Sequence, residues 1–264
     1  MERLLVLRLE AVGCNAEALL NGVPLARVDA ARPARTLPVH EFTLAGANEL
    51  ELVVQPALPG APEVIAPQLS DGKAWAGVRL LLPRVGQVAH PSNARTLAQL
   101  DWAAPDGEVY EAPLHLAQTV DLKIAFPRWR WLDAPLSDEV AAAKPQAAQL
   151  LQRLAVSLAR GDPEPFLTAA RLRFEELALA YQRSLADEAG RWRLRVQALG
   201  AAGPFKPELA SLAGLQLRKV AGGRLLECLA ADGQPALRGV GADGARRHWP
   251  LRVAVIEGGL HVMR

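Results

Sequence analysis

Hydrophobic and polar residues alternate through much of the first half of the chain. In the run 49–54, Leu50, Leu52 and Val54 are separated by residues of the opposite phase. A two-residue period is typical of a β-strand that buries one face. Upstream, Asn21-Gly22 lies between apolar runs, and it favours a type I′ hairpin turn because both central positions need positive φ. The pattern predicts antiparallel sheet.

Other segments of the first half have the same character. Turns are predicted at 13–15, 46–48 and 71–72, and a loop at 55–67, which contains four prolines. Pro38 places its segment at a sheet edge. The predicted strands are 5–10, 36–42, 75–82, 96–103 and 114–126. Because no helical period precedes residue 138, we predict an all-β sandwich of jelly-roll type.

The period changes near residue 140. Leucines at 150, 151, 154 and 158 have helical spacing, which predicts a helix over 147–159 that ends at Gly161. Asp162-Pro163 then fits the N-cap and first position of a second helix. Its apolar stripe runs from Phe166 to Leu185 in steps of three or four.

After Gly190 the two-residue period returns, and it predicts a strand over 191–196. Hairpins are predicted at 215–229, around the turn 221–223, and at 251–262, through 257–259. Helices followed by an antiparallel meander indicate an α+β domain with its helices packed on one face of a curved sheet.

We therefore expect two domains, a sandwich over 1–132 and an α+β domain over 144–264, joined by a linker at 133–143. The total of 264 residues suits two ordinary domains. Residues 1–139 carry 12 Lys and Arg against 17 Asp and Glu, whereas residues 140–264 carry 18 against 11. Opposite net charges favour docking of the two domains, and chance is the competing explanation.

Short motifs in each half carry a resemblance to a known family. Asn21-Gly22-Val23 and the run 46–50 (Gly-Ala-Asn-Glu-Leu) resemble the galactose-binding-like sandwich, where such positions are turns and a strand entry, so they imply fold and not sugar binding. The runs 249–253 and 257–262, after two helices, resemble the NTF2-like or cystatin-like fold. NTF2-like domains include isomerases, dehydratases and non-catalytic docking modules, so fold alone does not choose a function.

The chain lacks the usual marks of a metal or cofactor site. Cys14 and Cys228 lie in different halves, which implies no disulfide framework. The five histidines form no HxH or HExxH motif, and there is no CxxC and no phosphate-binding glycine loop. No apolar run reaches the ~20 residues of a membrane span. We expect no cofactor, no metal, no membrane contact and a cytoplasmic location.

Three ionisable residues are weak candidates for catalysis in the C-terminal cavity that the NTF2-like resemblance implies. Tyr181 lies on the apolar stripe of the second helix, Glu227 shares a strand face with two leucines, and His248 precedes Trp249. An enzyme of this kind needs a pair of groups whose pKa values are tuned by burial. The simpler interpretation is a buried, hydrogen-bonded tyrosine with an exposed histidine and glutamate.

Trp129-Arg130-Trp131 is the most unusual local sequence. In an extended backbone the two indoles fall on one face. They then suit packing between the domains, an anchor for an external protein, or stacking on a sugar or base.

Arg191, Arg193 and Arg195 form a predicted basic face if their segment is a strand. Nucleic acid is one interpretation of such a face. A solvated surface, or one docked on the acidic domain, is favoured instead. Nucleic-acid binding would want aromatic residues among the arginines, and Trp192 falls on the opposite face of the predicted strand.

Three functions remain open. The leading hypothesis is a non-catalytic, two-domain protein-binding accessory protein of bacterial type, such as an immunity or secretion-associated protein. The second is an isomerase- or dehydratase-like enzyme that uses the C-terminal cavity, and the third is carbohydrate binding by the sandwich. The expected partner is another protein, with a homodimer through the C-terminal sheet as a further candidate and nucleic acid disfavoured.

Overall fold

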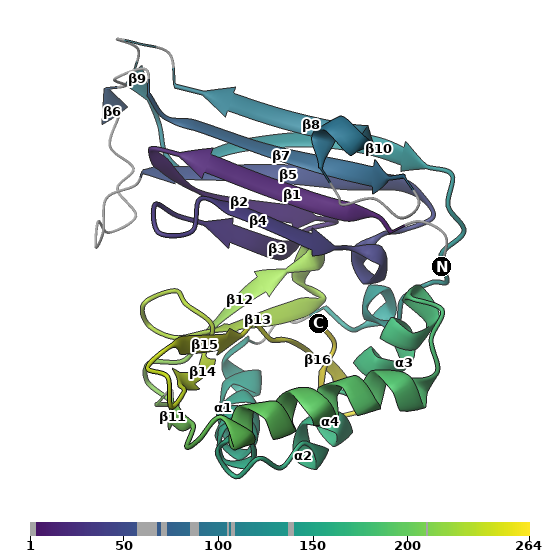
Figure 1. Ribbon diagram of the computed structural model, residues 1–264, viewed down its shortest axis with the longest axis vertical. Coiled ribbons are helices and arrows are strands. Elements are labelled where there is room, and N and C mark those ends of the chain that lie inside the picture. Colours follow the sequence, from purple (N-terminus) through teal and green to yellow (C-terminus); the bar gives the residue numbers. More distant parts are fainter. Residues whose placement is uncertain are drawn as a thin grey trace. The chain divides into compact units, whose positions relative to one another are not determined.

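The computed structural model describes residues 4–56, 68–69, 73–84, 90–104, 106, 109–136, 140–209 and 211–264. The chain divides into two compact units, Met1–Pro127 and Arg128–Arg264. In the described residues, antiparallel strands predominate and four α-helices lie in the second unit, so the fold is broadly α+β (Figure 1). Most of the expected proline-rich loop, at 57–67, and the expected turn at 71–72 lie outside the described residues.

The first unit contains two four-stranded antiparallel sheets, with strand orders β4-β1-β7-β8 and β10-β5-β2-β3. A short pair, β6 and β9, forms a separate sheet. The strands are β1 (Val6–Val12), β2 (Cys14–Leu20), β3 (Val23–Val28), β4 (Ala34–Pro38), β5 (Gly46–Pro56), β6 (Gln68–Leu69), β7 (Trp75–Pro83), β8 (Ala94–Ala103), β9 (Val109–Tyr110) and β10 (Leu114–Leu122). A jelly-roll arrangement is not confirmed.

The predicted alternation decides which face of β5 is buried. Leu50, Leu52 and Val54 are fully buried and pair with strands on both sides, whereas Glu49 is exposed. The Asn21-Gly22 turn is also confirmed. Both residues have positive φ, 54° and 70°, and they join β2 to β3 with Leu20 opposite Val23.

Asn48 holds the start of β5. Its amide nitrogen donates to the carbonyl oxygens of Leu44 and Gly46, at 2.9 and 2.8 Å, and its amide oxygen accepts from the Leu44 N–H at 2.7 Å. The residues expected to form a turn at 46–48 therefore form the entry of a strand, which a buried asparagine side chain closes.

Two strand predictions in the first unit were too long. The segment 36–42 ends as a strand at Pro38, at the sheet edge as expected, and continues as a short 3₁₀ helix, His40–Phe42. The segment 114–126 ends as β10 at Leu122, because Leu122 pairs with Gly46, the first residue of the partner strand.

The second unit begins with its helices: α1 (Val140–Ala159), α2 (Glu164–Ala169), α3 (Arg171–Ala180) and α4 (Leu185–Ala201). The leucine stripe of α1 is buried as predicted. The helix ends at Ala159, and the turn that follows it contains Gly161, whose φ is 70°. The helix starts earlier than expected, so part of the predicted linker 133–143 is helical.

The predicted second helix is broken and the predicted strand at 191–196 is wrong. A kink at Ala170 (φ −106°, ψ 17°) separates α2 from α3, and residues 185–201 form α4. The apparent alternation is accidental. Trp192, Val196 and Leu199 have the helical spacing of a buried face, whereas Leu194 is 67% exposed.

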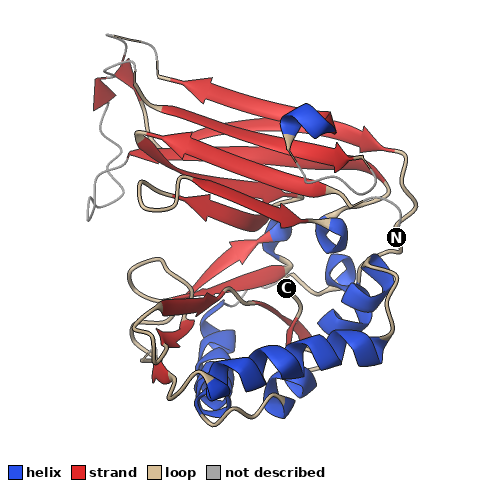
Figure 2. Cartoon of the chain, in the orientation of Figure 1, coloured by secondary structure: helices blue, strands red, loops and turns tan. Residues whose placement is uncertain are grey.

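Two antiparallel sheets complete the second unit, with orders β11-β14-β15 and β12-β13-β16-β17. Both predicted hairpins are confirmed, β12 with β13 and β16 with β17. Helix α1 packs against strands of both sheets, and Figure 2 shows the helices of this unit in blue. The strands are β11 (Lys206–Glu208), β12 (Gln216–Val220), β13 (Leu225–Leu229), β14 (Leu237–Val240), β15 (Arg246–Trp249), β16 (Arg252–Ile256) and β17 (Gly259–Val262).

Candidate functional site

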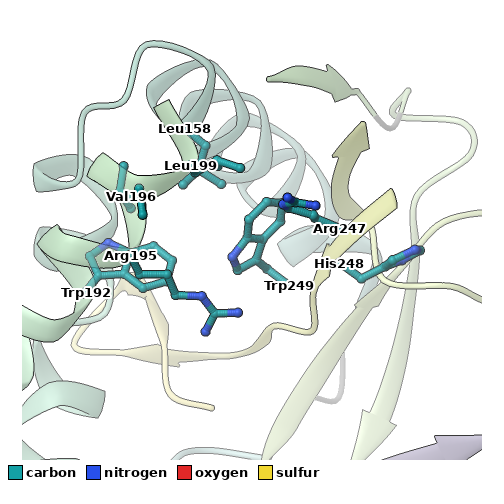
Figure 3. A pocket seen from close by; sticks show the side chains of 9 residues that line it. Leu158, Trp192, Arg195, Val196, Leu199, Arg247, His248 and Trp249 are labelled. Carbon is teal, nitrogen blue, oxygen red and sulfur yellow. The ribbon is translucent and has the colours of Figure 1, made fainter. Parts of the chain in front are cut away.

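A pocket of about 350 Å³ lies between α4 and β15 of the second unit (Figure 3). We call it the α4–β15 pocket. Helix α4 supplies residues at steps of three and four, the spacing of a single helix face. The lining residues are Leu158, Trp192, Arg195, Val196, Ala198, Leu199, Arg247, His248 and Trp249.

Much of the wall of the α4–β15 pocket is apolar, and further aromatic rings pack on its two tryptophans. The Trp192 indole stacks on Phe166 with ring centroids 4.1 Å apart, and Phe174 packs edge-on against Phe166 at 6.4 Å. Trp249 meets Phe205 edge-on at 5.3 Å. Such aromatic pairs are favourable beyond the area they bury, so both tryptophans are held in place by rings that are not among the lining residues.

The charge of the lining is entirely positive. Arg195 is exposed on α4, and none of the ion pairs found among the described residues includes it. Arg247 is half-buried and donates to the Asp243 carboxylate at 2.9 Å, which also lowers the pKa of that carboxyl. No aspartate or glutamate is among the described residues that line the pocket. The lining therefore offers a guanidinium group to an anion.

His248 is the one catalytic candidate that lines this pocket. Figure 3 shows its ring directed away from the space that Trp192 and Trp249 border. The strand geometry explains this, because neighbouring residues on β15 project to opposite faces. His248 thus contributes to the wall through its position on β15 and not through an imidazole aimed into the cavity.

The other catalytic candidates lie elsewhere. Glu227 on β13 is buried and receives hydrogen bonds from Arg218, at 2.6 and 2.9 Å, and from Arg252, at 2.9 Å. Tyr181 follows α3, is buried, and has the Arg183 guanidinium 5.2 Å from its ring centroid. Only one member of the predicted set is thus a pocket residue.

Cys228, beside Glu227, is buried on β13. Its burial raises the pKa of the thiol to about 12, so the group is protonated at neutral pH. A protonated thiol is a poor nucleophile, and this cysteine therefore adds nothing to the candidate chemistry.

The sequence Trp129-Arg130-Trp131 is not the extended platform that was expected, because residues 130–133 form a 3₁₀ turn. Both indoles are buried, and the Arg264 guanidinium lies 5.8 and 5.9 Å from their centroids. The Glu176 carboxylate accepts hydrogen bonds from the Arg264 side chain and from the Arg130 N–H. We call Trp129, Trp131, Glu176 and Arg264 the buried tryptophan cluster.

The predicted basic face does not exist as one surface. Arg191, Arg193 and Arg195 lie on a helix, where successive residues turn by about 100°. Arg193 pairs with Glu164 at 2.7 Å on α2, whereas Arg195 reaches the pocket. The expected shared face rested on the strand prediction that the structure overturns.

Sequence reasoning missed the pocket, although one signal for it was present. Residues 192, 195, 196 and 199 have the spacing of a single helix face, and Ser184 caps the helix by accepting a hydrogen bond from the Asp187 N–H at 3.0 Å. A serine followed three residues later by an acidic residue is a helix-start signature. It would have identified α4 but not its pairing with β15.

Comparison of the chain with protein-family models, curated proteins and solved structures finds no match. Among the described residues, no group of three or more histidine, cysteine or acidic side chains is arranged to hold a metal ion. Within the same residues, no helix has both the length and the apolar character required to cross a bilayer.

Proposed function

We propose that this chain is a non-catalytic, two-domain binding protein whose C-terminal unit recognises another protein through the α4–β15 pocket. The observation that supports this function is the lining itself. Two tryptophans that pack on further aromatic rings border the cavity, and arginine is the only charged residue type among the described residues that line it. Tryptophan and arginine are enriched among the residues that dominate protein–protein binding energy.

An enzyme that uses this cavity is the less favoured function. General acid–base chemistry needs titratable groups that converge on one reacting atom. In the α4–β15 pocket the only such residue is His248, whose ring is directed away from the space between the tryptophans (Figure 3). The Glu227 carboxylate forms ion pairs with Arg218 and Arg252, which is typical of a structural carboxylate.

A protein partner is favoured over a small molecule by the surface beside the pocket. Leu194 is 67% exposed on α4, next to Arg195, and Ala198 at the pocket is also exposed. A ligand confined to the cavity leaves Leu194 in water, whereas a partner that lies along α4 covers it. Burial of an exposed leucine contributes about 1.5–3 kcal/mol at most.

The family-level assignments belong to this proposal as well. The two four-stranded antiparallel sheets of the first unit are compatible with a galactose-binding-like sandwich. In the second unit, helices precede the antiparallel sheets, which is compatible with the NTF2-like or cystatin-like resemblance. On the proposed division, the boundary falls near Pro127 and not at residue 132, so Trp129 and Trp131 belong to the C-terminal domain.

The test is affinity capture with the full chain, a variant that blocks the pocket mouth, and a matched control. Ala198→Trp adds a large side chain at an exposed lining position without disturbing the core. Gln197→Trp makes the same addition at the neighbouring exposed residue, which does not line the pocket. Tagged versions of all three are incubated with lysate of the cells in which the chain is native, and captured proteins are quantified by mass spectrometry.

We expect one stoichiometric partner with the unmodified chain and with Gln197→Trp, and a loss of about tenfold or more with Ala198→Trp. Circular dichroism establishes that both variants are folded. Equal capture by Ala198→Trp contradicts the proposal, as does the absence of any stoichiometric partner. Capture of the chain's own second copy identifies a homodimer instead of a different partner.

A further inference from the structure

Building on the proposed function, we infer that the α4–β15 pocket recognises an acidic segment of the partner. A bulky apolar side chain of that segment enters between Trp192 and Trp249, and a neighbouring carboxylate pairs with Arg195. The occupant is therefore a peptide stretch that combines Asp or Glu with Leu, Phe or a similar residue. The inference combines the charge of the lining, its volume and the position of the arginine.

The charge of the lining selects an anion. Arg195 and Arg247 are the two arginines at the pocket, and the only carboxylate found on either is Asp243, which pairs with Arg247. Next along α4, Arg191 is also exposed. A basic segment therefore meets like charge here, whereas an acidic segment forms a charge-assisted hydrogen bond with a guanidinium that is already held on a rigid helix.

The shape of the pocket selects an apolar side chain next to that anion. Its volume of about 350 Å³ lies near the lower end of the ~300–1,000 Å³ range of ligand sites. Leu158, Val196 and Leu199 close the interior, with the two indoles at the sides (Figure 3). A large apolar side chain fits within such a space and displaces water from its apolar walls, which a bare phosphate or carboxylate does not achieve.

A nucleic-acid occupant fits these observations less well. Phosphate backbones are bound by several cations along one surface. On α4, however, Arg193 is engaged by Glu164 and points to another side of the helix than Arg195. One available guanidinium beside an apolar pocket suits a carboxylate on a peptide.

The test is selection from a phage-displayed random dodecapeptide library on the immobilised full chain. We expect the enriched peptides to combine Asp or Glu with a bulky apolar residue. The best peptide is then synthesised and titrated by calorimetry against the full chain and against Arg195→Glu. Arg153→Glu is the matched control, because it makes the same charge change at an exposed residue of α1 that does not line the pocket.

The expected result is at least about tenfold weaker binding by Arg195→Glu, and a change of no more than about threefold by Arg153→Glu. Replacement of the apolar residue of the peptide by glycine should weaken binding by about tenfold as well. Salt at about 1 M, where the Debye length is ~3 Å, should weaken binding of the acidic peptide. It should not weaken binding of an analogue in which glycine replaces the acidic residue.

Enrichment of basic or purely apolar peptides, or equal affinity for Arg195→Glu, overturns the inference. A library that yields no binders overturns it too. None of these outcomes decides the proposed function, because a partner whose capture depends on Ala198 still establishes the pocket as a protein-binding site. Conversely, Arg195-dependent peptide binding without a pocket-dependent partner supports the ligand chemistry and contradicts the proposed function.

Discussion

Two places in the C-terminal unit are built from the same residue types and end in opposite states. In the buried tryptophan cluster, Trp129 and Trp131 flank Arg264, and Glu176 neutralises the guanidinium. In the α4–β15 pocket, Trp192 and Trp249 border a cavity, and no carboxylate lines it. The residue types alone therefore do not separate a structural site from a binding site.

The difference lies in how each arginine is satisfied. Arg264 is almost fully buried, and a buried charge without a counter-charge is costly, so the cluster has to contain its own carboxylate. Arg195 is exposed and is solvated by water at no such cost. An exposed arginine beside an apolar cavity is available to a ligand. Arg264 is not, because it is buried and already pairs with Glu176.

The largest effect is expected from Glu176→Gln in the buried tryptophan cluster. This change removes the carboxylate that pairs with the buried Arg264 guanidinium, and we expect a loss of about 3–5 kcal/mol of unfolding free energy. Urea unfolding followed by tryptophan fluorescence measures it. Glu175→Gln is the matched control. Its carboxylate pairs with the more exposed Arg130 and Arg171, so a loss of about 1 kcal/mol or less is expected. Equal losses would show that the buried pair contributes no more to stability than the exposed pairs of Glu175.

An intermediate effect is expected at the start of α4, the helix that supplies most of the pocket. Ser184→Ala removes the acceptor of the Asp187 N–H, and we expect a loss of about 1 kcal/mol of stability. Ser184→Asp retains an acceptor at the cap and should restore most of it. Thermal unfolding of the three proteins checks the order. If Ser184→Asp is as unstable as Ser184→Ala, the cap does not stabilise α4.

Some features of the fold could be predicted from the sequence, and others could not. Local patterns were sufficient where one period dominates: the positive φ of Asn21 and the burial of Leu50 and Leu52 follow from neighbouring residues alone. In the run 191–196, two periods coexist. Trp192 and Val196 satisfy both a strand and a helix, and the capping serine at 184 decides between them.

The candidate site was beyond such reasoning for another reason. Arg195 lies on α4 and Trp249 on β15, far apart in the sequence, and the cavity exists only because these elements face each other. Likewise, nothing near Trp129 and Trp131 in the sequence reveals that the Arg264 guanidinium lies over both rings and pairs with Glu176. Long-range packing decided both outcomes.

The smallest effect on stability, and the sharpest contrast, is expected from Arg195→Met. The side chain is exposed and carries no ion pair found among the described residues, so its loss should change the unfolding free energy by no more than about 0.5 kcal/mol. Arg264→Met, by comparison, removes the guanidinium that pairs with the buried Glu176 carboxylate and should cost about 3–5 kcal/mol. Parallel urea titrations measure both. A large loss of unfolding free energy in Arg195→Met would mean that this arginine stabilises the fold, and that its guanidinium is not available to a ligand.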